Sequence, residues 1–151
     1  MDAFDADVLI YAAVPGHLLG RRVLALLPRE ATVHSEAPTG VGSVLLLPEI
    51  LAKPVREEAT AELVTLAAIL GRLDLRPVDD ATARLAVTLA ADYRLKAADA
   101  VHLATAVGVG ADRFITNNRR DFPRTITEVA VTYPADLAEP FEGVLGHSGG
   151  G

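Results

Sequence analysis

The stretch LKAADAVHLATAVGVGADRFITNN, residues 95–118, decides the fold of this 151-residue chain. Its first half places apolar residues at helical spacing, a Gly-rich turn follows, and a short apolar strand then runs into a Thr-Asn-Asn cluster. Asp99 lies at the start of the predicted helix. Because ligands of open α/β sheets bind beyond the carboxyl ends of the strands, the polar cluster marks a candidate site.

The same alternation of strand and helix continues on both sides of this stretch. Further strands are predicted up to Asp5 and over residues 41–43, 75–78 and 128–133, with Thr32 and Val33 as another short candidate. Helices are predicted over residues 19–27, 43–53, 57–73 and 79–93. Pro48 is expected to kink the second of these helices and Pro54 to end it. Alternation without consecutive hairpins predicts a parallel sheet wrapped by helices.

Length and composition bound the class of protein. The chain fits one domain, predicted over residues 1–140, with residues 141–151 as a flexible Gly-rich tail. No apolar run approaches the roughly 18 residues of a membrane span, and the start MDAFDADVL lacks signal-peptide features, so we expect a cytoplasmic protein without membrane association. The absence of cysteine excludes disulfides, thiolate metal sites and cysteine nucleophiles.

The charge balance limits how the chain can bind nucleic acid. It has 14 basic and 20 acidic residues, for a net charge of -6. That sign opposes binding by bulk electrostatics, so an RNA or DNA partner requires a local basic patch or a bridging cation.

Acidic residues follow several of the predicted strands. Asp5 ends the first strand, Glu49 lies on the helix after the second, and Asp99 opens the helix before the fourth. Asn118 and Asp121 follow that fourth strand. Carboxylates that meet at one sheet edge repel one another unless one is protonated or a divalent cation neutralises them. Ligation by oxygen alone selects Mg²⁺ or Mn²⁺, and such an ion suits phosphodiester hydrolysis.

Four segments of the chain, in order, resemble the signature blocks of the PIN domain family, and particularly its VapC-like toxin ribonucleases. They are FDADVLIYA (4–12), GSVLLLPEILAKPVR (42–56), ADAVHLATA (98–106) and RFITNNRRDF (113–122). The resemblance implies a three-layer α/β/α sandwich with a central, mainly parallel sheet. It also implies a Mg²⁺- or Mn²⁺-dependent endoribonuclease and, for the toxin branch, a homodimer neutralised by a cognate antitoxin protein.

The resemblance carries over to individual positions. It implies catalytic roles for Asp5, Glu49 and Asp99, while Asn118 stands where the family often has an acidic residue. Asn118 offers a carbonyl oxygen or orients a water but brings no charge. Asp7 and Asp121 are two candidates for restoring that charge. The expected catalytic set is Asp5, Glu49, Asp99 and Asn118, and the expected metal ligands are Asp5, Asp7, Asp99 and Asp121.

The loop after the fourth predicted strand is the expected substrate-binding segment. Thr116 and Asn117 either contact substrate or only close the loop. Arg119 and Arg120 either steer RNA phosphates past the acidic cluster or are solvated surface charges. His102 lies one helical turn after Asp99, and because such histidines are more often packed or surface residues, it is left out of catalysis.

Three functions remain open from the sequence. The leading hypothesis is a metal-dependent ribonuclease that acts as the toxin of a toxin-antitoxin pair. The second is a PIN-like scaffold that binds RNA or a protein and has lost catalysis, motivated by the neutral Asn118. The third is a phosphatase of the haloacid dehalogenase kind, suggested by the Asp5-Ala6-Asp7-Val8 spacing but lacking the Thr or Ser block and the late acidic pair of that reading.

Overall fold

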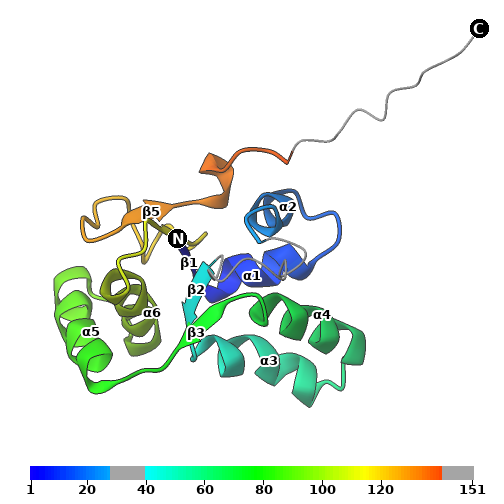
Figure 1. Ribbon diagram of the computed structural model, residues 1–151, viewed down its shortest axis with the longest axis horizontal. Coiled ribbons are helices and arrows are strands. Elements are labelled where there is room, and N and C mark those ends of the chain that lie inside the picture. Colours follow the sequence, from blue (N-terminus) through cyan, green and yellow to red (C-terminus); the bar gives the residue numbers. More distant parts are fainter. Residues whose placement is uncertain (28–39, 141–151) are drawn as a thin grey trace, which may run out of the picture.

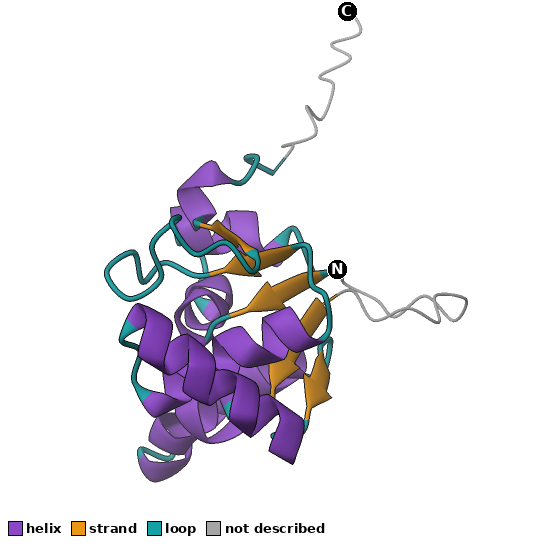
Figure 2. Cartoon of the chain, turned by 90° about the vertical axis from the view of Figure 1, so that its left-hand side faces the viewer, coloured by secondary structure: helices purple, strands orange, loops and turns teal. Residues whose placement is uncertain are grey.

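The structure is a computed structural model that describes residues 1–27 and 40–140. It contains a five-stranded sheet of order β3-β2-β1-β4-β5, in which every neighbouring pair of strands is parallel (Figure 2). The strands are β1 (Asp2–Phe4), β2 (Gly40–Ser43), β3 (Asp74–Arg76), β4 (Arg113–Ile115) and β5 (Ala130–Thr132). The predicted parallel sheet is thus confirmed. The candidate strand at residues 32–33 and the predicted tail, residues 141–151, lie outside the described residues.

Helices cover both faces of the sheet. They are α1 (Ala6–Ala13), α2 (Leu18–Leu24), α3 (Leu46–Arg56), α4 (Thr60–Leu70), α5 (Asp80–Tyr93) and α6 (Ala97–Gly108), followed by the short 3-10 helix η1 (Pro134–Asp136). Figure 1 shows α5 and α6 on one side of the sheet and α1 to α4 on the other. The three-layer α/β/α sandwich is confirmed. No helix in the described part of the chain has the length and apolar character needed to cross a membrane.

Alternate strand residues supply two separate cores. Ala3 and Phe114 pack against α5 and α6, whereas the next residues along the same strands, Phe4 and Ile115, pack against α1 to α4. This follows from the two-residue period of a strand, which sends successive side chains to opposite faces. Burial on both faces explains why Ala3 and Phe4 of β1, and Phe114 and Ile115 of β4, are consecutive apolar residues rather than alternating with polar ones.

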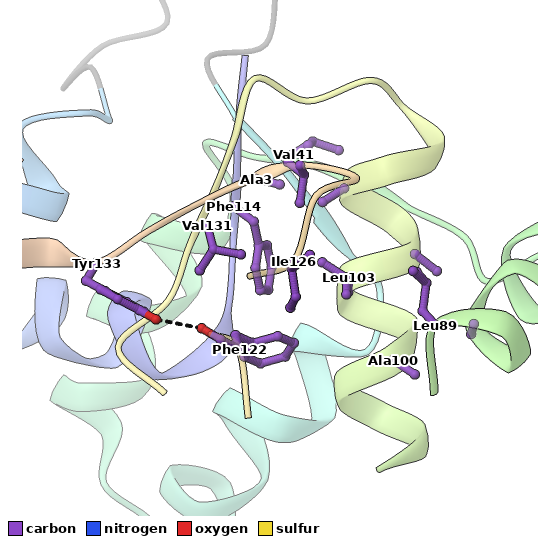
Figure 3. Packing of buried hydrophobic residues seen from close by; sticks show 14 residues of the cluster. Ala3, Val41, Leu89, Ala100, Leu103, Phe114, Phe122, Ile126, Val131 and Tyr133 are labelled. Atoms are coloured by element: carbon purple, nitrogen blue, oxygen red, sulfur yellow. Dashed lines mark hydrogen bonds between the residues drawn. The ribbon is translucent and has the colours of Figure 1, made fainter. Parts of the chain in front are cut away.

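The core on the α5 and α6 side is closed by the segment after β4 (Figure 3). The Phe122 ring meets Phe114 edge to face, with ring centroids 5.0 Å apart. The Tyr133 hydroxyl donates a hydrogen bond of 2.8 Å to the Phe122 carbonyl oxygen. These contacts fix the β4–β5 connection against the sheet, although it contains no helix.

The prolines of α3 do not act as predicted. The helix begins at Leu46, and Ser43 precedes it, accepting a hydrogen bond from the Leu45 N–H through its hydroxyl. Pro48 is therefore the third helical residue, where the missing N–H has no partner to lose, and the helix continues through it. The prediction that Pro54 ends the helix is wrong, because Pro54 is buried inside α3, which continues to Arg56. The later start also puts Glu49 in the first turn of α3.

The single helix predicted over residues 57–73 is shorter in the structure. Glu58 adopts a left-handed conformation with φ 52°, and α4 begins only at Thr60. Its buried face consists of Leu66, Ile69 and Leu70. Asp79 caps α5, since its side chain accepts a hydrogen bond from the Thr82 N–H.

The chain reverses its direction across the sheet between β1 and β4. From β1 it proceeds through α1 and α2 to β2, and through α3 and α4 to β3, all with helices on one face. The next crossover, α5 and α6, covers the opposite face and returns the chain to β4, on the other side of β1. Where the connections from two neighbouring strands leave on opposite faces of the sheet, a crevice forms at the carboxyl ends of those strands. That crevice is the expected ligand position in such a sheet.

Candidate functional site

Asp5 lies at the β1–β4 switch point and connects three elements. Its backbone N–H donates to the Ile115 carbonyl oxygen at 2.9 Å, which extends the pairing of the two strands. Its Oδ1 accepts from the Ala6 N–H at 2.9 Å and caps α1, while Oδ2 accepts from the buried Thr116 hydroxyl at 2.8 Å. The residue is 6% exposed. Burial raises the pKa of the Asp5 carboxyl above its usual range, and the Thr116 hydrogen bond opposes that rise.

Asp7, two residues further on, also connects α1 to the loop after β4. Its Oδ1 accepts from the Val8 N–H at 2.7 Å, and its Oδ2 accepts from the Asn117 N–H at 3.0 Å. Burial first, and then the charge of Asp5, raise the pKa of the Asp7 carboxyl to about 7. The side chain predicted to restore charge to the site therefore lies beside Asp5 and holds the loop after β4.

Asp99 approaches the cluster from the other face of the sheet. It occupies the first turn of α6 and is half-buried. Its pKa is raised by burial, followed by the charges of Asp5 and Asp121. Asp99 in turn contributes to the raised pKa of Asp7. The charge of Asp5 therefore acts on both Asp7 and Asp99, and the charge of Asp99 acts on Asp7.

Glu49 reaches the cluster from α3, and a buried histidine holds it. Its Oε2 lies 2.9 Å from Nε2 of His102 on α6. The charge of Glu49 contributes to the raised pKa of both Asp5 and Asp99. The glutamate side chain is 33% exposed, whereas the histidine side chain is 1% exposed. The contact with His102 was not anticipated from the sequence, although the three-residue spacing from Asp99 on an apolar helix was a usable signal.

The cluster forms where helices begin. Asp5 is the N-cap of α1, Glu49 lies in the first turn of α3, and Asp99 lies in the first turn of α6. Helices in this fold run back from the carboxyl edge of the sheet, so their N-termini gather there. The partial positive charge of a helix N-terminus favours a carboxylate, yet burial and mutual repulsion still raise the pKa of Asp5 and Asp99.

Asn118 and Asp121 are bound to each other. Asn118 Nδ2 donates to Asp121 Oδ2 at 2.9 Å, and the Asp121 N–H donates to Asn118 Oδ1 at 3.2 Å. The oxygen expected to assist catalysis is thus engaged by the loop itself, in a turn typical of Asn and Asp. Because Asp121 contributes to the raised pKa of Asp99, it adds negative charge to the cluster while Asn118 orients it.

The expected substrate-binding residues separate into two groups. Thr116 and Asn117 lie in the site, where they hold Asp5 and Asp7. Arg119 is exposed and its guanidinium stacks 4.4 Å from the centre of the Tyr133 ring, and Arg120 is also exposed. The sequence missed that Tyr133 anchors Arg119, because aromatic residues near a strand end are usually packing residues.

The chemistry of the donors fits a hard divalent cation. Within residues 1–27 and 40–140, Asp5, Asp7 and Asp99 form no ion pair with lysine or arginine. Their negative charge is therefore not neutralised by a basic side chain of these residues. The donors are oxygens, which Mg²⁺ and Mn²⁺ prefer. Across the same residues no three acidic or imidazole side chains are gathered tightly enough to enclose an ion. Mg²⁺ commonly binds through one or two carboxylates and retains its waters, so this arrangement suits it without a closed cage.

Three solved structures share the fold. One is a toxin-antitoxin complex from Klebsiella pneumoniae, with 24% identity and a TM-score of 0.70, covering 91% of this chain and 100% of the other. Another is VapBC2 from Rickettsia felis bound to a DNA fragment from their promoter, with 15% identity and a TM-score of 0.66, covering 87% and 97%. A third is FitAB bound to the IR36 DNA fragment, with 21% identity and a TM-score of 0.62, covering 92% and 99%.

Sequence comparison identifies the family. A search of curated protein sequences finds no match. The family model described as "PIN domain" matches residues 3–126, which include all but the first residue of β1, the strands β2 to β4, the helices α1 to α6 and every residue of the predicted site. Because that match extends over most of the sequence, the resemblance seen in the four motif blocks is confirmed, and the chain belongs to the PIN domain family.

Proposed function

We propose that this chain is an endoribonuclease that depends on Mg²⁺ or Mn²⁺. PIN domains are generally nucleases, and they generally use divalent metal ions. The observation that carries the proposal is the gathering of Asp5 and Asp7 on the loop after β4, at the switch point of the sheet, with Asp99 near enough to raise the pKa of Asp7. Keeping unpaired carboxylates together costs stability, and binding of a cation with a phosphate substrate offsets that cost.

Each residue has a defined task in this proposal. Asp5 and Asp99 are the primary metal ligands, with Asp7 and Asp121 as further acidic donors. Thr116 fixes Asp5, and the backbone N–H of Asn117 fixes Asp7, so that the ligands are oriented before substrate arrives. Glu49 is the remaining catalytic carboxylate and accepts or orients a proton of the attacking water. A bound ion supplies a more acidic water and neutralises charge on the phosphate under attack.

The net charge of the chain is negative, so binding of RNA phosphates requires a local positive surface. Arginines beside the site provide it. Arg119 lies in the loop that starts with Thr116, with its guanidinium over the Tyr133 ring, and Arg120 follows it. Guanidinium groups at this position attract the RNA backbone near the acidic cluster without specifying its sequence.

A cleavage assay tests the proposal. Purified protein is incubated with single-stranded and structured RNA in Mg²⁺, in Mn²⁺ and in EDTA, alongside Asp5→Asn and Asp99→Asn. Asp80→Asn is the matched control, since that carboxylate is 82% exposed and pairs only with Arg84. We expect cleavage by wild type and control with either metal, and none by the two site variants. Cleavage that survives EDTA or both site substitutions refutes the proposal.

A scaffold that binds RNA or a protein without catalysis is the alternative supported by a specific observation. Asn118 brings no charge, and its side-chain oxygen is already engaged by the Asp121 N–H. Calorimetric titration with Mn²⁺ distinguishes the two functions. Absence of metal binding with intact RNA binding supports the scaffold. The phosphatase reading is disfavoured by the family match, and trapping of an aspartyl-phosphate on Asp5 would restore it.

The proposed partner is an antitoxin protein. Of the three similar structures named above, one is a toxin-antitoxin complex, and VapBC2 and FitAB are each bound to a DNA fragment. The chain also has an apolar groove of about 350 Å³ between α1 and α4, lined in part by Ile10, Val14 and Leu66. Exposed apolar surface of this kind is typical of protein interfaces.

Co-purification tests the antitoxin proposal. The chain is produced together with the product of a small reading frame directly upstream, and the complex is measured by size exclusion with light scattering. Val14→Glu should weaken the complex, and Val87→Glu, a 69% exposed valine on α5, should not. No complex with wild type contradicts the proposal. The same measurement on the chain alone tests the expected homodimer.

A further inference from the structure

The most deeply buried ionisable group outside the assigned site is the His102 imidazole. It lies one turn after Asp99 on α6, so both side chains face the same way. Its Nε2 is 2.9 Å from Glu49 Oε2, and its side chain is 1% exposed. The proposed function assigns it no task.

We propose that His102 is a positioning residue that anchors Glu49 of α3 from α6 and so presents the other carboxylate oxygen, Oε1, to the metal and substrate. This inference rests on the proposed function. In the described part of the chain, Glu49 Oε1 has no hydrogen-bond partner, and one third of the side chain remains exposed. One oxygen is therefore held and the other is available.

The anchor reduces the entropy that ligand binding must overcome. A free glutamate loses about 1–2 kcal/mol of rotamer freedom when it is ordered. Here that loss is incurred on folding, because the anchoring imidazole is itself fixed by the packed α6 helix. A hydrogen bond shielded from water is also stronger than an exposed one. The Glu49 carboxylate is thus oriented before any ligand arrives.

Simple packing does not account for this histidine. The other ring nitrogen, Nδ1, is buried and has no hydrogen-bond partner among the described residues. Leaving a buried polar atom unpaired costs about 1–3 kcal/mol, a penalty that leucine or phenylalanine at the same place would avoid. The imidazole therefore makes one useful contact at a cost to stability. The imidazole also acts to lower the pKa of both Asp5 and Asp99, which places it within reach of these two carboxylates.

The test measures metal affinity rather than turnover alone. Mn²⁺ is titrated into metal-free protein by calorimetry for wild type, His102→Leu, His102→Gln and Glu49→Gln, with folding checked by circular dichroism. We expect His102→Leu to weaken Mn²⁺ binding by ~10-fold, as loss of a group that hydrogen-bonds to a metal ligand typically does. His102→Gln, which keeps a donor near the Nε2 position, should recover most of the loss. Thr105→Val is the matched control, because its hydroxyl is on the same helix and bonds only to the Val101 carbonyl oxygen.

A double-mutant cycle isolates the positioning effect. In the Glu49→Gln background, His102→Leu should change Mn²⁺ affinity by less than about 2-fold, because the anchored carboxylate is already absent. An equal loss in both backgrounds, or no loss in the wild-type background, overturns the positioning role. Failure of the proposed function has a different signature, namely no Mn²⁺ binding by wild type or undiminished binding by Asp5→Asn.

Discussion

Replacing Thr116 with valine tests how the site is held together. The side chain is 0% exposed, and its hydroxyl donates to Asp5 Oδ2 at 2.8 Å and accepts from the Asn118 N–H at 3.1 Å. Valine preserves the shape but removes both contacts. A hydrogen bond to a charged group contributes about 1.5–3 kcal/mol, and an N–H left without a partner adds to the loss, so we expect Thr116→Val to cost about 2–4 kcal/mol near pH 8. Most domains retain their fold at that cost.

The stability cost of Thr116→Val should depend on pH, and the direction of that dependence follows from the pKa of Asp5. Burial already raises the folded-state pKa of Asp5, and the Thr116 hydrogen bond opposes the rise. Removing that bond raises the folded-state pKa further above the unfolded value. A carboxyl group with a raised folded-state pKa contributes stability that is present below the unfolded pKa and lost as pH rises through the folded pKa. The penalty should therefore shrink toward about 1 kcal/mol as pH falls, because protonation of Asp5 leaves the lost bond between neutral groups.

Urea unfolding measures both quantities. Unfolding is followed by far-UV circular dichroism in EDTA at about pH 4.5 and about pH 8, with Thr116→Ser as the control that retains the hydroxyl. The serine variant loses only a methyl group, so its cost should be similar at the two pH values. A penalty for Thr116→Val below about 1 kcal/mol at the higher pH, or one that is independent of pH, would refute the reasoning.

Three further outcomes are expected. Asp7→Asn should stabilise the metal-free protein near pH 8 by at most ~4 kcal/mol, because the pKa of about 7 means that stability is lost as pH rises from about 4 to about 7. Urea titrations near pH 5 and pH 8 in EDTA should show the gain falling to ~1.5 kcal/mol at the lower pH, which lies about one unit above the unfolded pKa. Gly20→Ala should cost ~3 kcal/mol or more in a thermal unfolding scan, since its Cβ would lie 2.0 Å from the Tyr11 carbonyl oxygen, whereas Gly108→Ala, with nothing within 4 Å, should be neutral or stabilising by ~0.5 kcal/mol. Asn118→Asp should lower the melting temperature of the metal-free protein, because the new carboxylate repels Asp121. It should also give a larger Mn²⁺-induced rise in melting temperature than wild type shows. An unchanged rise contradicts the view that position 118 limits metal binding.

The order of strands and helices was predictable because it depends on local patterns. The helical spacing of apolar residues predicts α6, and the short apolar runs around Ala3 and Phe114 predict strands. The alternation of strands and helices along the chain then predicts a parallel sheet. Helix ends were less predictable. Pro54 lies in the last turns of α3 because its ring is buried, a tertiary effect that overrides the tendency of proline to end a helix. Glu58 adopts a left-handed turn that its residue type does not indicate.

The candidate site followed from topology more than from any single motif. Carboxyl ends of neighbouring parallel strands meet, so Asp5, Asp7 and the loop at Thr116 were expected together, and the structure joins them. Contacts between side chains of different helices leave no comparable trace in the sequence. The Glu49 and His102 pair joins residues 53 positions apart, and only the packing of α3 and α6 reveals it.

The backbone around Asp5 and Asp7 provides a built-in spectroscopic reporter. The N–H groups of Ala6, Val8 and Asn117 donate directly to these two carboxylates. Amide resonances are sensitive to the charge of the group they bond to, so proton loss or ion binding at the cluster registers in the nitrogen-proton correlation spectrum of unmodified protein. Occupancy of the site can therefore be followed residue by residue before any substrate has been identified.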